Sequence, residues 1–269
     1  MTMATTSSVL LLRLAGPLQS WGATTPFNRR DTRSEPTKSG IIGLLAAAQG
    51  LDRGEDITHL TGLILGVRVD QPGTTLRDYH TVSDYRGLPL PSAAVNTKGR
   101  QKPTSPAKPT YVTTRYYLQD AVFVAALAGP TELMDTLREA ITNPHFPLSL
   151  GRRSCVPTGP LVIGTSHSTV HQALKDLPWQ ASEHARRNYQ RHVGSVSTID
   201  LPISLDHTPG TGTTDGRIDI VPDLPISFDP QTRAYAQRQV RHDWVTVPTG
   251  FPDTDTPDTA HDPFALLRW

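Results

Sequence analysis

A loop sequence at residues 148–160, LSLGRRSCVPTGP, combines residue types that bind phosphate. Gly151 would let the backbone approach an oxyanion closely, the neighbouring Arg152 and Arg153 supply charge and donors, and Ser154 adds a hydroxyl. Paired arginines are also common as purely structural groups. Because this pair lies between a predicted helix and a predicted strand, we favour contact with the phosphates of RNA.

A second candidate segment, LRDYHTVSDYRG at residues 76–87, mixes planar and cationic side chains as single-strand nucleic acid binders do. Its candidate contacts are Arg77, Tyr79, His80 and Tyr85. The alternative is an ordinary strand edge and turn. His80 beside Tyr79 also has the chemistry for acid/base work in metal-independent RNA cleavage, although a surface hydrogen bond is the commoner use of a histidine.

The sequence RSEPTKSGIIGLLAAAQG, residues 33–50, predicts a helix start that attracts an anion. Thr37 or Ser39 can cap the helix, and free N–H groups at such a start bind phosphate. A nucleotide-binding P-loop needs its Lys-Ser pair after the glycines, whereas here Lys38 and Ser39 precede them. ATP binding is therefore not expected, and Arg33, Lys38 and Ser39 are assigned instead to RNA phosphate.

The first predicted strand, VLLLRLAG at residues 9–16, places Arg13 on the face opposite Leu10, Leu12 and Leu14. On an open sheet face Arg13 would meet RNA or pair with an acidic neighbour, and the sequence leaves both open. Trp21 follows in the turn GPLQSWG. It would stack on a base or pack into the protein.

Metal and cofactor chemistry finds little support among the ten histidines. The spacing HSTVH, with His167 and His171, matches a helical zinc pair but lacks the accompanying glutamate, and the single Cys155 rules out a CxxC site. No G-x-S-x-G nucleophile motif occurs. We expect no metal, no cofactor and no catalytic residue.

Apolar patterning predicts four strands and two helices. The strands cover 9–16, 60–70, 120–129 and 158–164, and the helices cover 39–50 and 131–142, the second capped by Thr131. The order β-α-β-β-α-β indicates an α+β fold, the ferredoxin-like or RNA-recognition-motif arrangement. This core would form a first domain over residues 1–165.

Two segments exceed that core. About fifty residues separate the second and third predicted strands, and within them residues 98–115 would form a protruding hairpin with a basic tip, or else a disordered loop. Its basic residues are Lys98, Arg100, Lys102, Lys108 and Arg115. Residues 166–269 predict a small β-rich extension with a mobile acidic end.

Composition supports a cytoplasmic protein with a genuine core. The chain has 269 residues, 36% of them hydrophobic, and no apolar run long enough for a signal peptide or a membrane helix. Net charge divides along the chain: residues 1–195 hold 21 Lys and Arg against 14 Asp and Glu, and residues 196–269 hold 5 against 11. The first part would face a polyanion, or the two parts would balance each other.

Several of these segments together resemble the CasD family of type I-E Cascade, a CRISPR RNA-guided antiviral surveillance complex. They are LRLAGPLQSWG, PTKSGIIGLLAAAQG, LRDYHTV, LGRRSC followed by TGPLVIGT, and HDWVTV. The motifs occur in the family's order and cover nearly the whole chain, most closely over residues 9–165.

The resemblance implies a ferredoxin-like core with a protruding thumb, which would be residues 77–115, and a ribonucleoprotein subunit that holds the 5′ handle of CRISPR RNA. It implies contacts with the Cascade backbone subunit and the large PAM-reading subunit, close to target DNA at the PAM-proximal end of the guide. The family member of type I-E is non-catalytic, whereas a related type I-C subunit cleaves precursor RNA. The enzyme alternative is therefore a metal-independent endoribonuclease.

Overall fold

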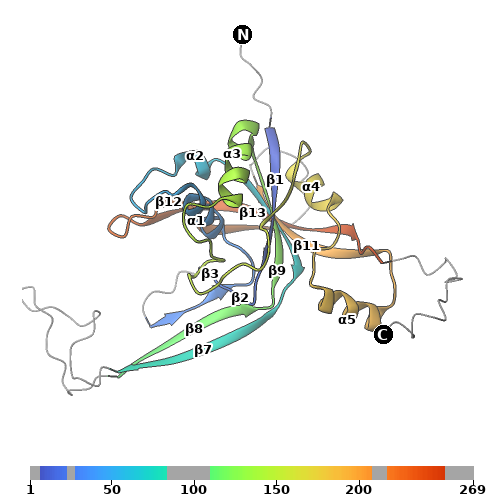
Figure 1. Cartoon of the computed structure of the whole chain (residues 1–269), viewed down its shortest axis with the longest axis horizontal. Coiled ribbons are helices and arrows are strands. Elements are labelled where there is room, and N and C mark those ends of the chain that lie inside the picture. Colours follow the sequence, from blue (N-terminus) through green and yellow to red (C-terminus); the bar gives the residue numbers. More distant parts are fainter. Residues whose placement is uncertain (1–6, 23–27, 84–109, 208–216, 252–269) are drawn as a thin grey trace, which may run out of the picture.

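A seven-stranded antiparallel sheet forms the centre of the molecule in the computed structural model, which describes residues 7–22, 28–83, 110–207 and 217–251 (Figure 1). Its strand order is β10-β1-β9-β6-β11-β13-β12. The strands are β1 Ser7–Ala15, β6 Ile64–Gln71, β9 Val122–Pro130, β10 Val162–Ser166, β11 Thr198–His207, β12 Arg217–Ser227 and β13 Ala234–Pro248. The strands predicted at 60–70, 120–129 and 158–164 are thus present with shifted bounds.

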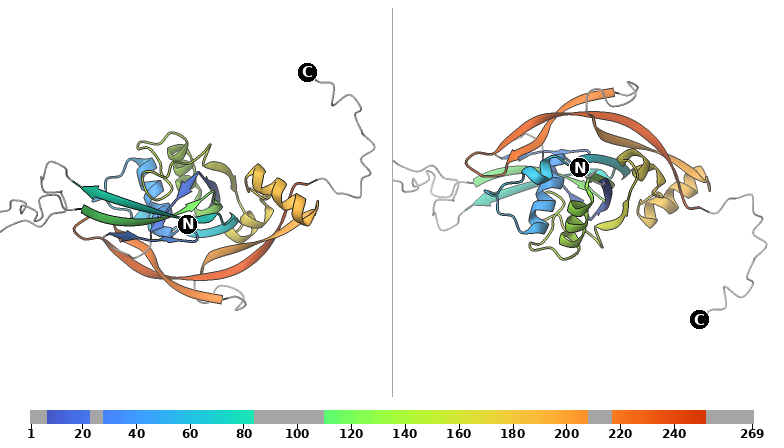
Figure 2. Two further views of the ribbon diagram at one scale, coloured as in Figure 1. Left: turned by 90° about the horizontal axis from the view of Figure 1, so that it is seen from below. Right: turned by 90° about the horizontal axis from the view of Figure 1, so that it is seen from above.

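Both faces of the sheet are covered, because strand side chains alternate between them. Leu10, Leu12 and Leu14 of β1 pack with helices α1 Lys38–Gln49 and α3 Thr131–Thr142, and the short α2 Thr58–Thr61 lies beside α1. Val9 and Leu11 point to the opposite face, toward α4 Val170–Asp176 and the segment before α5 Glu183–Val193. Figure 2 shows β12 and β13 curving along one side of the molecule.

The start and end of α1 agree with the sequence prediction, whereas the cap of α3 does not. α1 starts where the Thr37 hydroxyl accepts from the Gly40 N–H at 3.1 Å, and it ends at Gly50 with φ +82°. Thr131 was the predicted cap of the second helix, but Pro130 occupies that position and offers no side-chain acceptor. The cap prediction at Thr131 is therefore wrong.

The strands after residue 166 continue the central sheet. β11 pairs with β6 through Ile203–Arg68, Ser204–Val67 and Leu205–Gly66, so the predicted extension shares hydrogen bonds with the core. Its helices α4 and α5 lie between β10 and β11 in the chain. The acidic residues beyond 251 lie outside the described part of the chain.

An antiparallel hairpin projects from the body, with β7 Thr74–Ser83 paired to β8 Thr110–Gln119 (Figure 1). We call this hairpin the arm. On the other side of β8 lie β2 Leu18–Gln19 and β4 Arg29–Arg30, and β3 Trp21–Gly22 pairs with β5 Thr32–Arg33. Tyr85, Lys98, Arg100, Lys102 and Lys108 lie outside the described residues.

None of the helices in the described part of the chain is long and apolar enough to cross a membrane.

Candidate nucleic-acid interface

One face of the arm presents a row of arginines and tyrosines. Arg77 pairs across the hairpin with Tyr116, Tyr79 pairs with Thr114, and Thr114 pairs on its other side with Arg29 of β4. Residues paired in this way share a sheet face. The face formed by Arg29, Arg77, Tyr79 and Tyr116 is here called the arginine–tyrosine face.

The groups of the arginine–tyrosine face are preorganised and open to solvent. The Arg29 guanidinium lies 5.3 Å from the centre of the Tyr116 ring, and Arg77 lies 5.9 Å from that of Tyr79. Tyr79 is 56% exposed, and the Arg29 side chain is 67% exposed. Exposed aromatic planes beside cations are the combination that stacks single-stranded bases and holds their phosphates.

The opposite face of the arm holds the only histidine that the sequence linked to cleavage. His80 Nδ1 lies 3.0 Å from Asp78 Oδ2, and both side chains are at least partly exposed. Asp78 pairs across the hairpin with Arg115, which pairs in turn with Arg30 of β4. This face therefore mixes one carboxylate with two cations and a histidine.

The predicted phosphate loop around Gly151 is mainly structural. Gly151 has φ +91°, and a Cβ there would lie 1.7 Å from the Ser20 carbonyl oxygen, so glycine is needed for packing against β2–β3. Arg152 donates to the carbonyls of Tyr116 and Arg30, each at 2.9 Å, and its guanidinium stacks 4.7 Å from the Tyr117 ring. We correct the assignment of Arg152: it fastens the arm to the loop.

The next two residues of that loop remain candidates for direct contact. Arg153 and Ser154 are exposed, whereas Cys155 is buried. Burial raises the pKa of the Cys155 thiol, although Ser154 and Arg152 oppose that rise. Arg153 is thus an exposed cation next to Arg152 at the base of the arm.

The predicted anion site at the start of α1 is occupied by the protein's own carboxylate. The backbone N–H of Lys38 donates to Asp223 Oδ2 at 2.8 Å, and Lys38 Nζ lies 2.7 Å from Asp206 Oδ2. The Lys38 side chain is only 9% exposed, and Ser39 hydrogen bonds to Thr37 at 3.3 Å. Assigning Lys38 to RNA phosphate is therefore wrong for this conformation.

Arg238 completes a buried charge cluster with Lys38, Asp206 and Asp223. Its guanidinium contacts Asp223 at 2.6 Å and also pairs with Asp206. Burial acts to lower the pKa of Arg238, but its hydrogen bonds and attraction to Asp223 and Asp206 raise it above the ordinary value. Here two carboxylates from the second part of the chain neutralise Lys38 of the first part and Arg238 of their own part.

Two residues from the first strand and its turn also have internal roles. Arg13 donates to the Gln180 carbonyl at 3.1 and 3.2 Å, so it holds the segment before α5, where the acidic group that it also influences is the buried Asp70. Trp21 is completely buried, and its indole N–H donates to Gln19 at 3.1 Å. Its ring has no surface on which a base could stack, which corrects that assignment.

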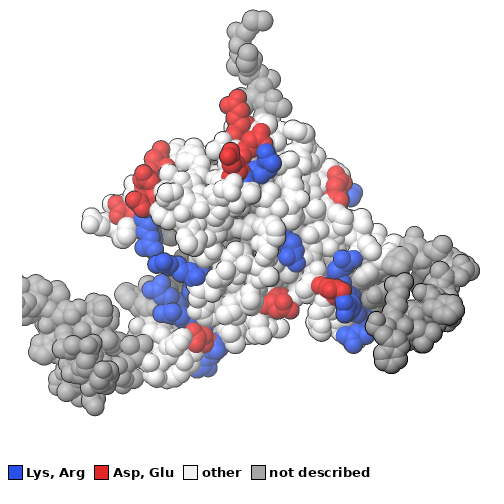
Figure 3. All heavy atoms as spheres, in the orientation of Figure 1, with Lys and Arg blue, Asp and Glu red and all other residues white. Residues whose placement is uncertain are grey.

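Sequence reasoning missed Arg29, Arg30 and Tyr116. Arg33, which it included, is half-buried in β5. Tyr116 lies in TYVTTRYYLQ, whose alternation on β8 places it on the same face as Thr114. Arg29 could have been noticed as part of a basic pair, but its place beside Tyr116 depends on the parallel β4–β8 pairing. Figure 3 shows Lys and Arg side chains gathered beside β3 and at the start of the arm.

No group of three or more histidine, cysteine, aspartate or glutamate side chains able to hold a metal occurs within the described ranges. His171 lies on α4, but His167 precedes that helix and is exposed. The two do not form a helical i,i+4 pair.

Comparison with known proteins gives consistent matches. The family model described as CRISPR-associated protein (Cas_Cas5) matches residues 9–241. The CRISPR system Cascade subunit CasD of Escherichia coli (strain K12) is 38% identical over 181 residues, which cover 60% of this chain and 73% of that protein.

Two solved structures resemble the whole fold. A chain of a CRISPR RNA-guided surveillance complex is 34% identical, with a TM-score of 0.68, and the match covers 92% of this chain and 95% of that chain. A structure described as a Cas protein is also 34% identical, with a TM-score of 0.60 and coverage of 91% and 100%. The chain and these relatives therefore share a mixed α/β fold with mostly antiparallel sheets.

Proposed function

The chain belongs to the Cas5 family of CRISPR-associated proteins and is a subunit of a CRISPR surveillance complex of the Cascade type; from this premise we propose that it binds and caps the 5′ handle of CRISPR RNA. The arginine–tyrosine face is the observation that carries the proposal. Its exposed cations match a sugar-phosphate chain, and its exposed rings match unpaired bases.

The proposed contacts follow from which cations are exposed. Arg29 also pairs with Asp31 at 3.0 Å, but this is a surface ion pair, which a phosphate can replace at little cost. Arg29 and Arg77 hold phosphates while Tyr79 stacks on a base, and Arg153 with Ser154 extends the contact at the loop. Arg115 lies on the opposite face of the arm and Arg33 on the neighbouring β5, and we assign both to further contacts with the RNA. Arg152 acts indirectly, because its hydrogen bonds set the position of the arm.

The order of four central strands supports a ferredoxin-like core. Counted along the chain, β1, β6, β9 and β10 are the first to fourth strands of the predicted unit, and they lie side by side as fourth, first, third, second. α1 and α3 cover one face of these strands. We assign residues 1–165 to this unit and residues 166–269 to an extension that prolongs its sheet.

The arm suits the thumb role that the family resemblance implies. Residues 77–115 would separate the handle from the guide, with target DNA near the PAM-proximal end. The remaining surface would contact the Cascade backbone subunit and the large PAM-reading subunit, as expected for a cytoplasmic ribonucleoprotein. The acidic extension, which repels RNA, would face protein.

The decisive experiment is assembly with defined RNA. The full chain is expressed with the other Cascade subunits of its host and a CRISPR array, and the RNA that copurifies is sequenced. We expect guide RNAs with one uniform 5′ end, protected from nuclease by the chain. A double substitution, Arg77→Ala with Tyr79→Ala, should remove that protection while a substitution of exposed Arg138→Ala leaves it intact. Unchanged protection in the double variant would reject the proposal.

We propose that the subunit is non-catalytic, and the His80–Asp78 pair keeps a metal-independent endoribonuclease as the second candidate. Incubation of the purified chain with precursor repeat RNA in EDTA separates the two. We expect intact RNA. A specific cut that disappears in His80→Ala would establish the enzyme instead.

A further inference from the structure

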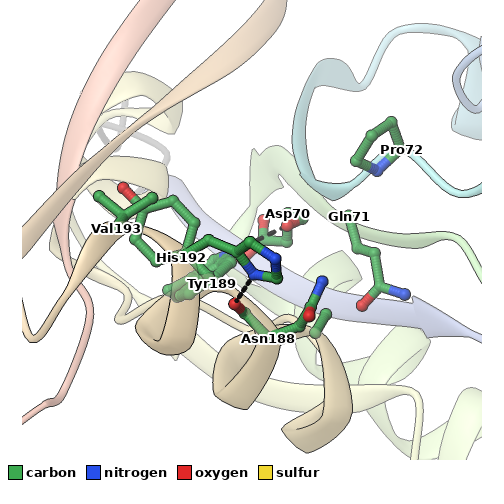
Figure 4. Close-up of a pocket in the computed structure, with 9 residues that line it drawn as sticks. Asp70, Gln71, Pro72, Asn188, Tyr189, His192 and Val193 are labelled. Carbon is green, nitrogen blue, oxygen red and sulfur yellow. Dashed lines mark hydrogen bonds between the residues drawn. The ribbon is translucent and has the colours of Figure 1, made fainter.

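A cavity of about 310 Å³ lies between the end of β6 and α5, away from the arm (Figure 4). Its apolar lining comes from Trp179, Ala185, Tyr189 and Val193, and Gln71 and Pro72 line it from the strand side. The RNA-binding proposal leaves this cavity without a role.

The cavity is rigidly built. The Trp179 indole N–H donates to the Asp70 carbonyl at 2.8 Å, and the Trp179 and Tyr189 rings meet edge to face at 5.3 Å. The Asp70 carboxylate accepts two bonds from fully buried Arg68 at 2.8 Å and one from the Gln180 N–H. Preformed apolar cavities with fixed walls are suited to binding an apolar group.

α5 beside the cavity has an uncovered cationic surface. None of its residues is buried, and Arg187, Arg191, His184 and His192 are exposed, with Arg187 in a surface pair with Glu183 of the same helix. Arg186 is only partly satisfied: its Nη2 donates to the Thr249 carbonyl at 2.7 Å, but its buried Nε has no hydrogen-bond partner within the described residues. A buried donor of this kind is a site for an acceptor.

The chain itself leads to this surface. The Phe251 ring lies 6.3 Å from Trp179 and 5.5 Å from the Arg186 guanidinium. Residues 252–269 follow directly and contain four aspartates, one arginine and then the apolar Phe264, Leu266, Leu267 and Trp269. The family match ends at residue 241, so this segment is not part of the shared family pattern.

We propose that residues 252–269, here called the tail, dock on α5 and place an apolar side chain in the cavity. The aspartates complement the α5 cations, with Asp253 close enough along the chain to accept from Arg186 Nε. Twelve residues lie between Phe251 and Phe264. At roughly 3.3–3.6 Å for each extended residue, they reach any point of the helix. The cost of closing such a loop rises only slowly with its length. This docking is independent of RNA binding.

Cysteine crosslinking in the full chain tests the proposal. Ala265→Cys is combined with Asn188→Cys at the cavity rim, and the matched control combines Ala265→Cys with Thr142→Cys, an exposed position on α3. The native Cys155 is buried and stays in both. Under mild oxidation we expect an intrachain disulfide to form at least tenfold faster in the first pair, and more slowly at high salt.

A second variant tests the cavity itself. Val193→Glu places a charge in the cavity lining. The control Val156→Glu places the same charge outside the cavity, at a valine that is 61% exposed where Val193 is 54% exposed. Val193→Glu should slow the Asn188 crosslink about tenfold, whereas Val156→Glu should not change it. Equal rates for the two cysteine pairs, interchain dimers as the main product, or no effect of Val193→Glu would each overturn docking of the tail.

Discussion

The arm and the start of α1 are both rich in cations, yet they use them in opposite ways. Arg77 of the arm and Arg29 of the adjoining β4 lie over tyrosine rings and face solvent, and the ion pair of Arg29 with Asp31 is at the surface. Lys38 at the start of α1 is buried against Asp206, and its backbone N–H is held by Asp223. A positive side chain attracts RNA only where no carboxylate from another part of the chain has already neutralised it.

The difference arises from the second part of the chain. β12 and β13 bring Asp223 and Arg238 against α1, whereas β7 and β8 extend beyond the reach of those acids. Figure 1 shows the arm projecting away from the sheet that carries β12 and β13. The location of each region relative to the acidic strands therefore decides which cations are available.

The largest effect should come from breaking the buried cluster. Asp223→Ala leaves Arg238 and the start of α1 without their main acceptor, and loss of one partner of a buried pair costs about 3–5 kcal/mol. Urea unfolding would measure the lower free energy of unfolding. Asp243→Ala is the control, because its pair with Arg241 spans 3.8 Å at a 41% exposed carboxylate and should cost under about 1 kcal/mol. If Asp223→Ala and Asp243→Ala lost similar free energies of unfolding, the buried cluster would contribute no more to stability than a surface ion pair.

Removing the cations of the arginine–tyrosine face comes next. Arg29→Ala with Arg77→Ala should weaken binding of labelled handle RNA by about 3 kcal/mol, since each exposed arginine loses one charge-assisted bond at the low end of the usual range, about 1.5 kcal/mol. The dependence of log affinity on log salt should fall by about 0.7 for each lost phosphate contact. Fluorescence anisotropy across salt concentrations measures both, and Arg138→Ala with Arg217→Ala removes two exposed cations elsewhere. If the two double variants lost the same affinity and the same salt dependence, RNA would be attracted by overall charge and not by the arginine–tyrosine face.

A smaller loss should follow from removing one stacking ring. Tyr79→Ala should weaken the same RNA by about 1–2 kcal/mol because a stacked base is lost, with the salt slope unchanged. Tyr79→Phe keeps the ring and should bind as the parent does. A large loss in Tyr79→Phe would show that the hydroxyl, not the ring, makes the contact.

The smallest effect on RNA should come from Lys38. Lys38→Met removes a cation but keeps an unbranched stem of similar length, and the salt slope of RNA binding should stay as in the parent because Asp206 already pairs that charge. The titration used for the arm variants measures it. If the dependence of log affinity on log salt fell by about 0.7 in Lys38→Met, Lys38 would contact an RNA phosphate after all.

The sequence pattern predicted much of the core correctly. Apolar periodicity located β1, β6, β9, α1 and α3 to within a few residues, and Gly50 ended α1 in the expected left-handed conformation. These features depend on neighbours a few residues apart, which the sequence displays directly. The fourth strand was shifted because Thr158 and Gly159 belong to the loop before it.

Site residues were predicted less well because the same residue type serves opposite purposes. Gly151 and Arg152 matched a phosphate loop in composition, yet Ser20, Tyr116 and Arg30 supply the contacts that explain them. Trp21 is buried by elements far away in sequence. Conversely, Tyr116 became a candidate only when β8 was paired with β4 and β7.

Sequence alone determined the succession of strands and helices, the basic and acidic parts of the chain, and the family to which the motifs point. Tertiary structure alone decided which cations are free, because neutralisation of a charge depends on a partner brought close from more than a hundred residues away, as Asp206 is to Lys38. The local order of residues predicts the hydrogen bonds within helices and the alternation of side chains between the two faces of a strand. The availability of a charge is set by long-range packing, which only the folded chain specifies.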